Sequence, residues 1–244
     1  MSRFKAAGIH LLISILIVLA TLAVMWFVWY PKGMFKLLGG GELLLIISCV
    51  DVTLGPLLTL AVFDSTKKLI KMDLAIIGVL QIAALLYGMH VMFQARPVFN
   101  VLEEDRFSVT LASDFKDDAR LKKAKKPEWQ SLGWTGPKLV AAIGPTDQKE
   151  KEEIMFSGQS WNAFPQLYVD YDSQRKVALK NAKPLSMLRK NKFNVEEIDA
   201  FLAKTGKPDS GFVTLPIVYA YTMMAAVLDA KTGDFIEIID AKEE

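Results

Sequence analysis

The stretch GIHLLISILIVLATLAVMWFVWY, residues 8–30, contains 23 consecutive positions without Asp, Glu, Lys or Arg. About 20 apolar helical residues cross a bilayer, so this stretch predicts a transmembrane helix. Its apolar run exceeds the ~7–15 residues typical of a secretory signal, and no small-residue cleavage site follows Trp29 and Tyr30. We therefore expect the helix to be retained, with these two aromatic side chains at the membrane interface.

Two further apolar segments of spanning length lie at residues 43–63 and 74–95, and Asp51 is the one charged residue in them. Charge is concentrated beyond residue 95, where 22 Lys and Arg accompany 23 Asp and Glu. Because that region is nearly neutral, its charge gives no support for nucleic-acid binding. We expect residues 1–95 to form a three-helix transmembrane unit and residues 96–244 to form one soluble domain.

Basic residues are unevenly distributed over the short segments that flank the three predicted spans. Five lie at the N-terminus and between the second and third spans, against two between the first and second: Arg3, Lys5, Lys67, Lys68 and Lys71 against Lys32 and Lys36. Cytoplasmic flanks carry the excess of Lys and Arg, so the N-terminus is expected in the cytoplasm. Three crossings then place the soluble domain on the opposite side of the membrane, which in a bacterium with two membranes is the periplasm.

Several segments of the soluble domain have the composition of β-strands. Residues 99–112 predict strands around a charged turn, and residues 138–143 predict a buried strand. Residues 215–228 are too short for a fourth span and contain Pro216, so they are interpreted as a buried strand. Residues 223–240 predict a β-hairpin with Gly233 available for the positive-φ position.

Three other segments of the soluble domain predict helices, with Thr146 as the N-cap of the first, and Asn194 and Gly206 as the boundaries of the last. They are residues 146–156, 173–190 and 194–207. The expected fold class is therefore a membrane protein with three N-terminal transmembrane helices, followed by a periplasmic α+β domain that ends in a β-hairpin.

The soluble domain lacks the residues that most catalytic sites require. Both histidines, His10 and His90, lie within predicted spans, so the domain has no imidazole base and no histidine metal ligand. The sequence has no nucleotide-binding glycine motif, no G-x-S-x-G and no C-x-x-C, and Cys49 has no partner for a disulfide. We expect no enzymatic activity, no cofactor and no metal site.

Two features of this domain have both a functional and a structural interpretation. The segment YVDYD, residues 168–172, contains two acids that could bind a cation, but it is more typical of a strand end or a helix start. Trp129, Trp134 and Trp161 could form a ligand-binding face, but they are expected mainly as core aromatics.

Asp51 is the most informative residue of the apolar half, because an ionised carboxylate near the bilayer centre costs roughly 2.5–3.5 kcal/mol. On a helix it belongs to a small and polar stripe that faces protein rather than lipid, formed by Ser48, Asp51, Val52, Gly55 and Thr59. Pro56 cannot donate a backbone hydrogen bond, so the helix is expected to kink beside Asp51.

Only side chains at a similar depth in the membrane can form a hydrogen bond with the Asp51 carboxylate. At about 1.5 Å per residue, Tyr87 lies at the level of Asp51 and His90 roughly one turn nearer the exterior. Either side chain could satisfy the carboxylate and brace the bundle. Alternatively, Asp51 lies in a groove where it meets a partner helix or a transported ion.

Four segments of this sequence resemble the type IV pilin accessory proteins of Gram-negative bacteria. They are MSRFKAAGIHLLIS (1–14), WYP (29–31), DVTLGPLLTLAVFD (51–64) and QIAALLYGMHVMFQARPVFNVLEEDRF (81–107), joined near the end of the chain by AAVLDAKTGDFIEIID (225–240). The resemblance implies an inner-membrane, chaperone-like protein that binds its cognate major pilin, through the membrane helix and the globular head, and aids pilus assembly without catalysis.

The partner-binding residues that we expect are those of the polar stripe and its neighbours: Ser48, Asp51, Gly55, Pro56, Thr59, Tyr87 and His90. A second function stays open, that of an ion-coupled membrane component or a signalling receptor that uses Asp51 and His90.

Overall fold

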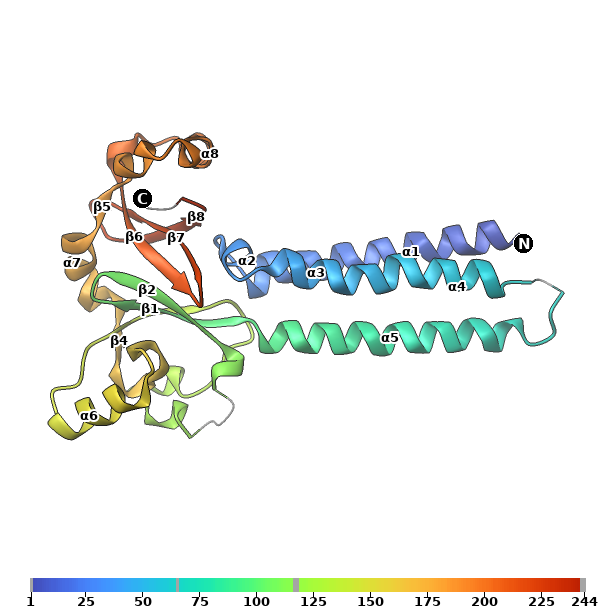
Figure 1. The fold of residues 1–244 in the computed structure, drawn as a ribbon, viewed down its shortest axis with the longest axis horizontal. Helices are drawn as coiled ribbons and strands as arrows, with labels where there is room; N and C mark the ends of the chain where they lie inside the picture. Colours follow the sequence, from blue (N-terminus) through green and yellow to red (C-terminus); the bar gives the residue numbers. More distant parts are fainter. Residues whose placement is uncertain (1, 65, 116–118, 242–244) are drawn as a thin grey trace. The chain divides into compact units, whose positions relative to one another are not determined.

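The computed structural model describes residues 2–64, 66–115 and 119–241, which form two compact units (Figure 1). One, the helical unit, comprises the chain up to Val28 together with Gly39–Ala95. The other, the α+β unit, comprises Trp29–Leu38 and the chain from Arg96 onward. The segment between the first and second apolar helices therefore belongs to the α+β unit.

The helical unit contains three long apolar helices. The first is α1 (Arg3–Val24) with a π-helical extension, the second combines α3 and α4 around a π-helical turn, and the third is α5 (Ile70–Gln94). The remaining bounds are Met25–Trp29 for the extension, and Gly40–Ser48, Cys49–Leu54 and Gly55–Val62 for the second helix. All three are long and apolar enough to cross a membrane, which confirms the prediction of three such helices.

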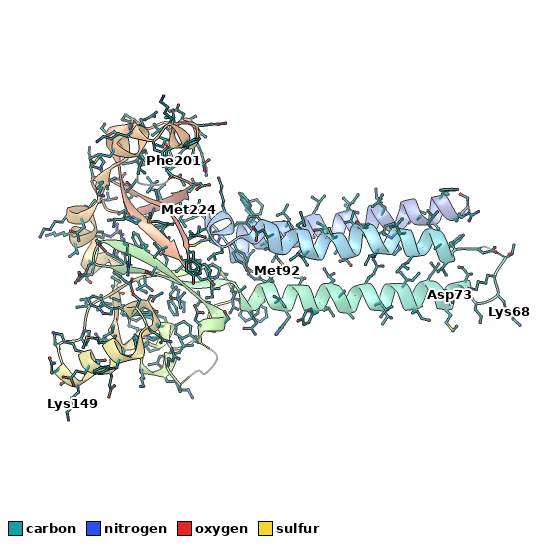
Figure 2. The ribbon with its side chains drawn as sticks, in the orientation of Figure 1. Lys68, Asp73, Met92, Lys149, Phe201 and Met224 are labelled. Atoms are coloured by element: carbon teal, nitrogen blue, oxygen red, sulfur yellow. The ribbon has the colours of Figure 1, made fainter. Side chains whose placement is uncertain are left out.

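The three helices pack α1 against α4 and α4 against α5. Most of their large apolar side chains remain exposed along the unit (Figure 2). In the connection between α4 and α5, Lys67 forms an ion pair with Asp73. An apolar surface of this extent suits a lipid environment better than water.

The α+β unit is built on one mixed, curled sheet with the order β4-β3-β1-β2-β6-β7-β8, while β5 pairs with β6. The strands are β1 (Pro97–Glu103), β2 (Arg106–Leu111), β3 (Lys138–Ala142), β4 (Tyr168–Asp170), β5 (Lys183–Pro184), β6 (Phe212–Tyr219), β7 (Thr222–Asp229) and β8 (Phe235–Ile239). The pairs β1–β3 and β2–β6 are parallel, and the others are antiparallel. The expected strands in 99–112 and 138–143 are confirmed as β1, β2 and β3.

Curling of the sheet brings side chains of non-adjacent strands together. The ring of Phe107 on β2 lies 5.3 Å from that of Phe235 on β8 and 5.9 Å from that of Tyr171 on α7 (Tyr171–Asn181). The Tyr171 hydroxyl donates a hydrogen bond of 2.6 Å to the carbonyl of Gly233. Helix α7 is thereby fixed to the turn between β7 and β8.

Two apolar clusters lie at the two ends of this sheet. One gathers around Phe99 of β1, whose ring lies edge-on to those of Phe115 and Tyr168. The other lies beneath α8 (Val195–Thr205) (Figure 2). There the ring centroid of Phe201 lies 4.9 Å from that of Phe212 on β6. These clusters give the unit its core.

The segment Trp29–Leu38 completes this core from the opposite end of the sequence. It contains the short helix α2 (Met34–Leu37) and buries Tyr30. The backbone N–H of Ile238 on β8 donates to the carbonyl of Lys32 at 3.0 Å, and the Lys32 ammonium donates to the carbonyl of Phe235. The segment therefore covers the edge of the sheet that β8 would otherwise expose.

Some predicted boundaries differ from the structure for local reasons. Helix α6 (Gln148–Ser157) is capped by Asp147, whose carboxylate accepts from the N–H of Glu150, and not by Thr146. The helix expected at 173–190 ends at Asn181 because Pro184 disfavours helix in the residue before it. Helix α8 follows Asn194 and ends at Gly206, as predicted.

The apolar stretch 215–228 forms two strands rather than one. It contains the C-terminal half of β6 and most of β7, joined at Ala220 and Tyr221. Ala220 has a φ of +50°, a conformation that sequences usually supply with glycine or asparagine. The turn therefore carries no sequence signal.

The turn between β7 and β8 is held by Asp229 and has Gly233 at a φ of +70°. Hydrogen bonds from the N–H of Lys231, the Lys207 ammonium and the N–H of Thr232 lower the pKa of Asp229 to about 2. At neutral pH the Asp229 carboxylate is thus ionised, and its hydrogen bonds hold the turn in place.

Candidate partner-binding site in the helical unit

Asp51 lies in the π-helical turn of the second helix with its side chain 5% exposed. Its Oδ1 atom is fully enclosed and has no hydrogen-bond partner in the part of the chain that the structure describes. Buried carboxylate oxygens are normally paired, because an unmade hydrogen bond costs about 1–3 kcal/mol, and more for a charged group. Among the described residues of this unit, Asp51 therefore has a buried carboxylate oxygen, Oδ1, that accepts no hydrogen bond.

The π-helical turn follows from Pro56, which has no N–H to give to a carbonyl one turn earlier. The side-chain amide of Gln81 on α5 supplies a replacement by donating to the backbone carbonyl of Asp51 at 3.4 Å. The expected irregularity beside Asp51 is thus present as a π-helical turn. Such turns are frequent at functional sites.

Gly55 allows two polar side chains to approach the second helix closely. A Cβ atom at this position would collide with the amide of Gln81, and it would lie 3.0 Å from Nε2 of His10. His10 of α1 also shares a 2.6 Å hydrogen bond with the hydroxyl of Thr59, one turn further along. One small residue therefore joins polar groups from all three helices.

The residues of the polar stripe differ in how deeply they are buried. Ser48 is half-buried, and its hydroxyl donates to the carbonyl of Leu44 in its own helix. Asp51, Gly55 and Thr59 are buried, whereas Pro56 is half-buried. We call the group formed by His10, Asp51, Gly55, Thr59 and Gln81 the polar cluster.

The structure does not bring Tyr87 or His90 to Asp51. Tyr87 is 72% exposed and His90 is also exposed, so both point away from the interior of the helical unit. His10 of α1 approaches the second helix instead, beside Gly55 and Thr59. The sequence prediction compared the membrane depth of Asp51 only with residues of the third span. Counting residues along the first span as well would have placed His10 near the level of Thr59.

The arrangement contains a carboxylate oxygen without a hydrogen-bond donor among the described residues, and because this oxygen is enclosed, a donor or cation from outside reaches it only if the helices separate. Within the described residues, no group of three His, Cys, Asp or Glu side chains is placed to hold a metal ion.

The two ambiguous features of the α+β unit have structural roles. Asp170 ends β4 and forms a 2.6 Å ion pair with Lys126, while α7 begins at the next residue. Trp129 is buried in the core as predicted, whereas Trp134 is exposed and not a core residue. Trp161 is half-buried beside the loop that follows β3.

Comparisons with known proteins agree on one family. A family model for the fimbrial assembly protein FimB matches residues 1–39. The fimbrial assembly protein of serogroup E1 from Dichelobacter nodosus is 35% identical over 187 residues, covering 75% of this chain and 72% of the relative. The serogroup I protein of the same organism is 33% identical over 207 residues, covering 82% and 80%. No solved structure matches this chain.

Proposed function

Because this chain belongs to the family of fimbrial assembly proteins, we propose that it binds and stabilises its cognate major type IV pilin and aids the incorporation of that pilin into the pilus. Family membership confirms the resemblance to type IV pilin accessory proteins and supports a role in pilus assembly. The family names suggest an assembly role rather than catalysis. In this proposal the protein acts as a chaperone and turns over no substrate.

We place the three apolar helices in the inner membrane, with the N-terminus in the cytoplasm and the α+β unit in the periplasm. The length and hydropathy of the helices support insertion, and the excess of basic residues on one side supports the orientation. A pilin before assembly, as the family resemblance implies, has one long apolar N-terminal helix and a globular head. A protein with a helical unit and an α+β unit can bind both parts.

The enclosed Oδ1 of Asp51 is the observation that carries this proposal. A free N-terminal amine of a partner helix can reach that oxygen when the helices of this unit separate, because Oδ1 is fully enclosed in the unbound protein. The attraction between amine and carboxylate is stronger in a low-dielectric groove than in water, although desolvation of both charges offsets part of it.

Co-purification from membranes tests the proposal directly. A tagged full-length protein, extracted in mild detergent from cells that produce the cognate pilin, is expected to recover that pilin. Deleting the gene is expected to lower pilin abundance and surface pili while leaving the covalent modifications of pilin unchanged in mass spectra. Loss of a modification would identify an enzyme instead.

Reporter fusions test the proposed orientation. A reporter that is active only in the periplasm is expected to be active when fused after residue 110, and one that is active only in the cytoplasm is expected to be inactive there. Fusions in the connection between α4 and α5 should give the reverse pattern, because Lys67, Lys68 and Lys71 predict a cytoplasmic segment. Periplasmic activity at that connection would contradict the orientation.

A further inference from the structure

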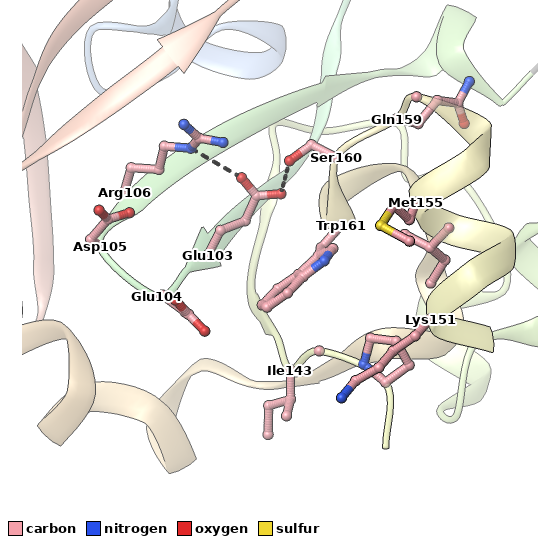
Figure 3. A pocket seen from close by; sticks show the side chains of 14 residues that line it. Glu103, Glu104, Asp105, Arg106, Ile143, Lys151, Met155, Gln159, Ser160 and Trp161 are labelled. Atoms are coloured by element: carbon pink, nitrogen blue, oxygen red, sulfur yellow. Dashed lines mark hydrogen bonds and ion pairs between the residues drawn. The ribbon is translucent and has the colours of Figure 1, made fainter. Parts of the chain in front are cut away.

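The α+β unit contains an open cavity of about 940 Å³ that the polar cluster does not include (Figure 3). It lies between the β1–β2 turn, the loop after β3, and α6. Its volume falls in the range of ligand pockets, roughly 300–1,000 Å³. It is distinct from every residue that we assigned to partner binding from the sequence.

The buried acid of this cavity is already satisfied. Glu103 accepts hydrogen bonds from the hydroxyls of Ser108 (2.6 Å) and Ser160 (2.7 Å) and from the N–H of Asn162 (2.9 Å), and it pairs with Arg106. A carboxylate with this many donors has little capacity left for a metal ion or a charged ligand. The inner end of the cavity is therefore structural.

Apolar side chains form the open wall. The indole of Trp161 lies against Gly144, where an added Cβ would be 2.8 Å from the ring (Figure 3). Ile143 and Met155 both line the cavity and are exposed, Met155 to 70%. Large apolar side chains gathered at the mouth of a cavity indicate a surface that another molecule covers.

Two acidic residues without an ion-pair partner among the described residues border this wall. Glu104 and Asp105, in the β1–β2 turn, are exposed and form no ion pair with any residue in the described ranges. The turn is held in place by Asn181 of α7, whose amide donates to the carbonyl of Glu104 at 2.8 Å. The two carboxylates are thus presented on a fixed turn beside an apolar opening.

We infer that this cavity binds a segment of the pilin head, in which an apolar side chain enters beside Trp161 and an adjacent Lys or Arg reaches Glu104 and Asp105. The inference rests on the proposed function and names a second contact for it. Charge complementarity selects the occupant: Lys151 of α6 also lines the cavity, but the β1–β2 turn carries two exposed acids, so this side of the opening attracts a basic residue and repels anionic lipid headgroups. An apolar anchor within a charged rim is the usual composition of a protein interface.

A photo-crosslinking residue at Met155 in the full-length protein tests this contact in cells that produce pilin. The expected product is a covalent adduct with pilin, mapped by mass spectrometry to a segment with an apolar residue next to Lys or Arg. Reversing the rim charge with Glu104→Lys and Asp105→Lys together is expected to lower the adduct at least about fivefold, the effect of roughly 1 kcal/mol. The control reversal Glu196→Lys, at an exposed position of α8, should leave it unchanged.

The outcomes separate this inference from the proposed function. If pilin co-purifies with the protein but no adduct forms at Met155, or the adduct is insensitive to the rim charges, the inference is wrong and the function stands. An adduct that maps to lipid or to a second copy of this chain also overturns it. If pilin does not co-purify at all, both fail.

Discussion

Replacing Gly33 with alanine is expected to lower the free energy of unfolding of the α+β unit by about 2–6 kcal/mol. Gly33 has a φ of +84°, which strains any residue with a Cβ. A Cβ there would also collide with the carbonyl oxygen of Ile238 and lie 2.9 Å from the Cβ of Ile238. Strain and overpacking each contribute about 1–3 kcal/mol to this range.

Thermal unfolding of the full-length protein in detergent, followed by near-ultraviolet circular dichroism, measures this effect. The midpoint should fall by roughly 5–15 °C for a unit of this size. Gly206→Ala is the matched control, because Gly206 has a φ of +65° but nothing within 4 Å of an added Cβ. It should cost only about 1 kcal/mol. Equal losses in the two variants would show that residues 29–38 do not pack on β8 as described.

Replacing Asp51 with asparagine is expected to reduce recovery of pilin roughly 30-fold or more while leaving the abundance of the protein unchanged. Loss of one member of a desolvated charge pair costs about 2–5 kcal/mol, which corresponds to that reduction. The protein itself should not be destabilised, because Oδ1 of Asp51 makes no hydrogen bond within the described residues. Quantitative immunoblots of membranes and of co-purified pilin measure both quantities.

Two further variants distinguish partner binding from bracing of the helical unit. Cys49→Ala should change neither quantity, because Cys49 is exposed on another face of the same helix. His10→Ala removes the hydrogen bond to Thr59 and should reduce abundance if the polar cluster serves mainly as a brace. If Asp51→Asn lowers abundance in parallel with His10→Ala, the carboxylate is structural and does not receive a partner.

The sequence predicted those elements whose signals are local. Apolar length identified the three long helices, and residue patterns identified β1, β2, β3 and the boundaries of α8. Turn chemistry failed at Ala220 and Tyr221, where a positive φ occurs without glycine or asparagine. The pairing of β6 with β7, in which Tyr219 lies opposite Thr222, closes that turn, and no glycine or asparagine marks it in the sequence.

The candidate site was predicted on one helix but not across helices. Helical spacing placed Asp51, Gly55 and Thr59 on one buried face. It could not specify that His10 and Gln81 approach that face, because the rotation of each neighbouring helix depends on packing. Tyr87 and His90 were chosen by depth alone, and depth does not determine the direction in which a side chain points.

The pairing of Lys32 with β8 has a consequence for the order in which the chain is made. The Lys32 ammonium and the carbonyl of Phe235 are 203 residues apart, so the early segment leaves the ribosome long before its partner. Until β7 and β8 are synthesised, the apolar segment that contains Tyr30, Met34 and Leu37 lacks the strands against which it packs. The α+β unit can therefore fold completely only after the last strand has been synthesised. A chain that ends before Phe235 exposes an apolar segment that proteases can recognise.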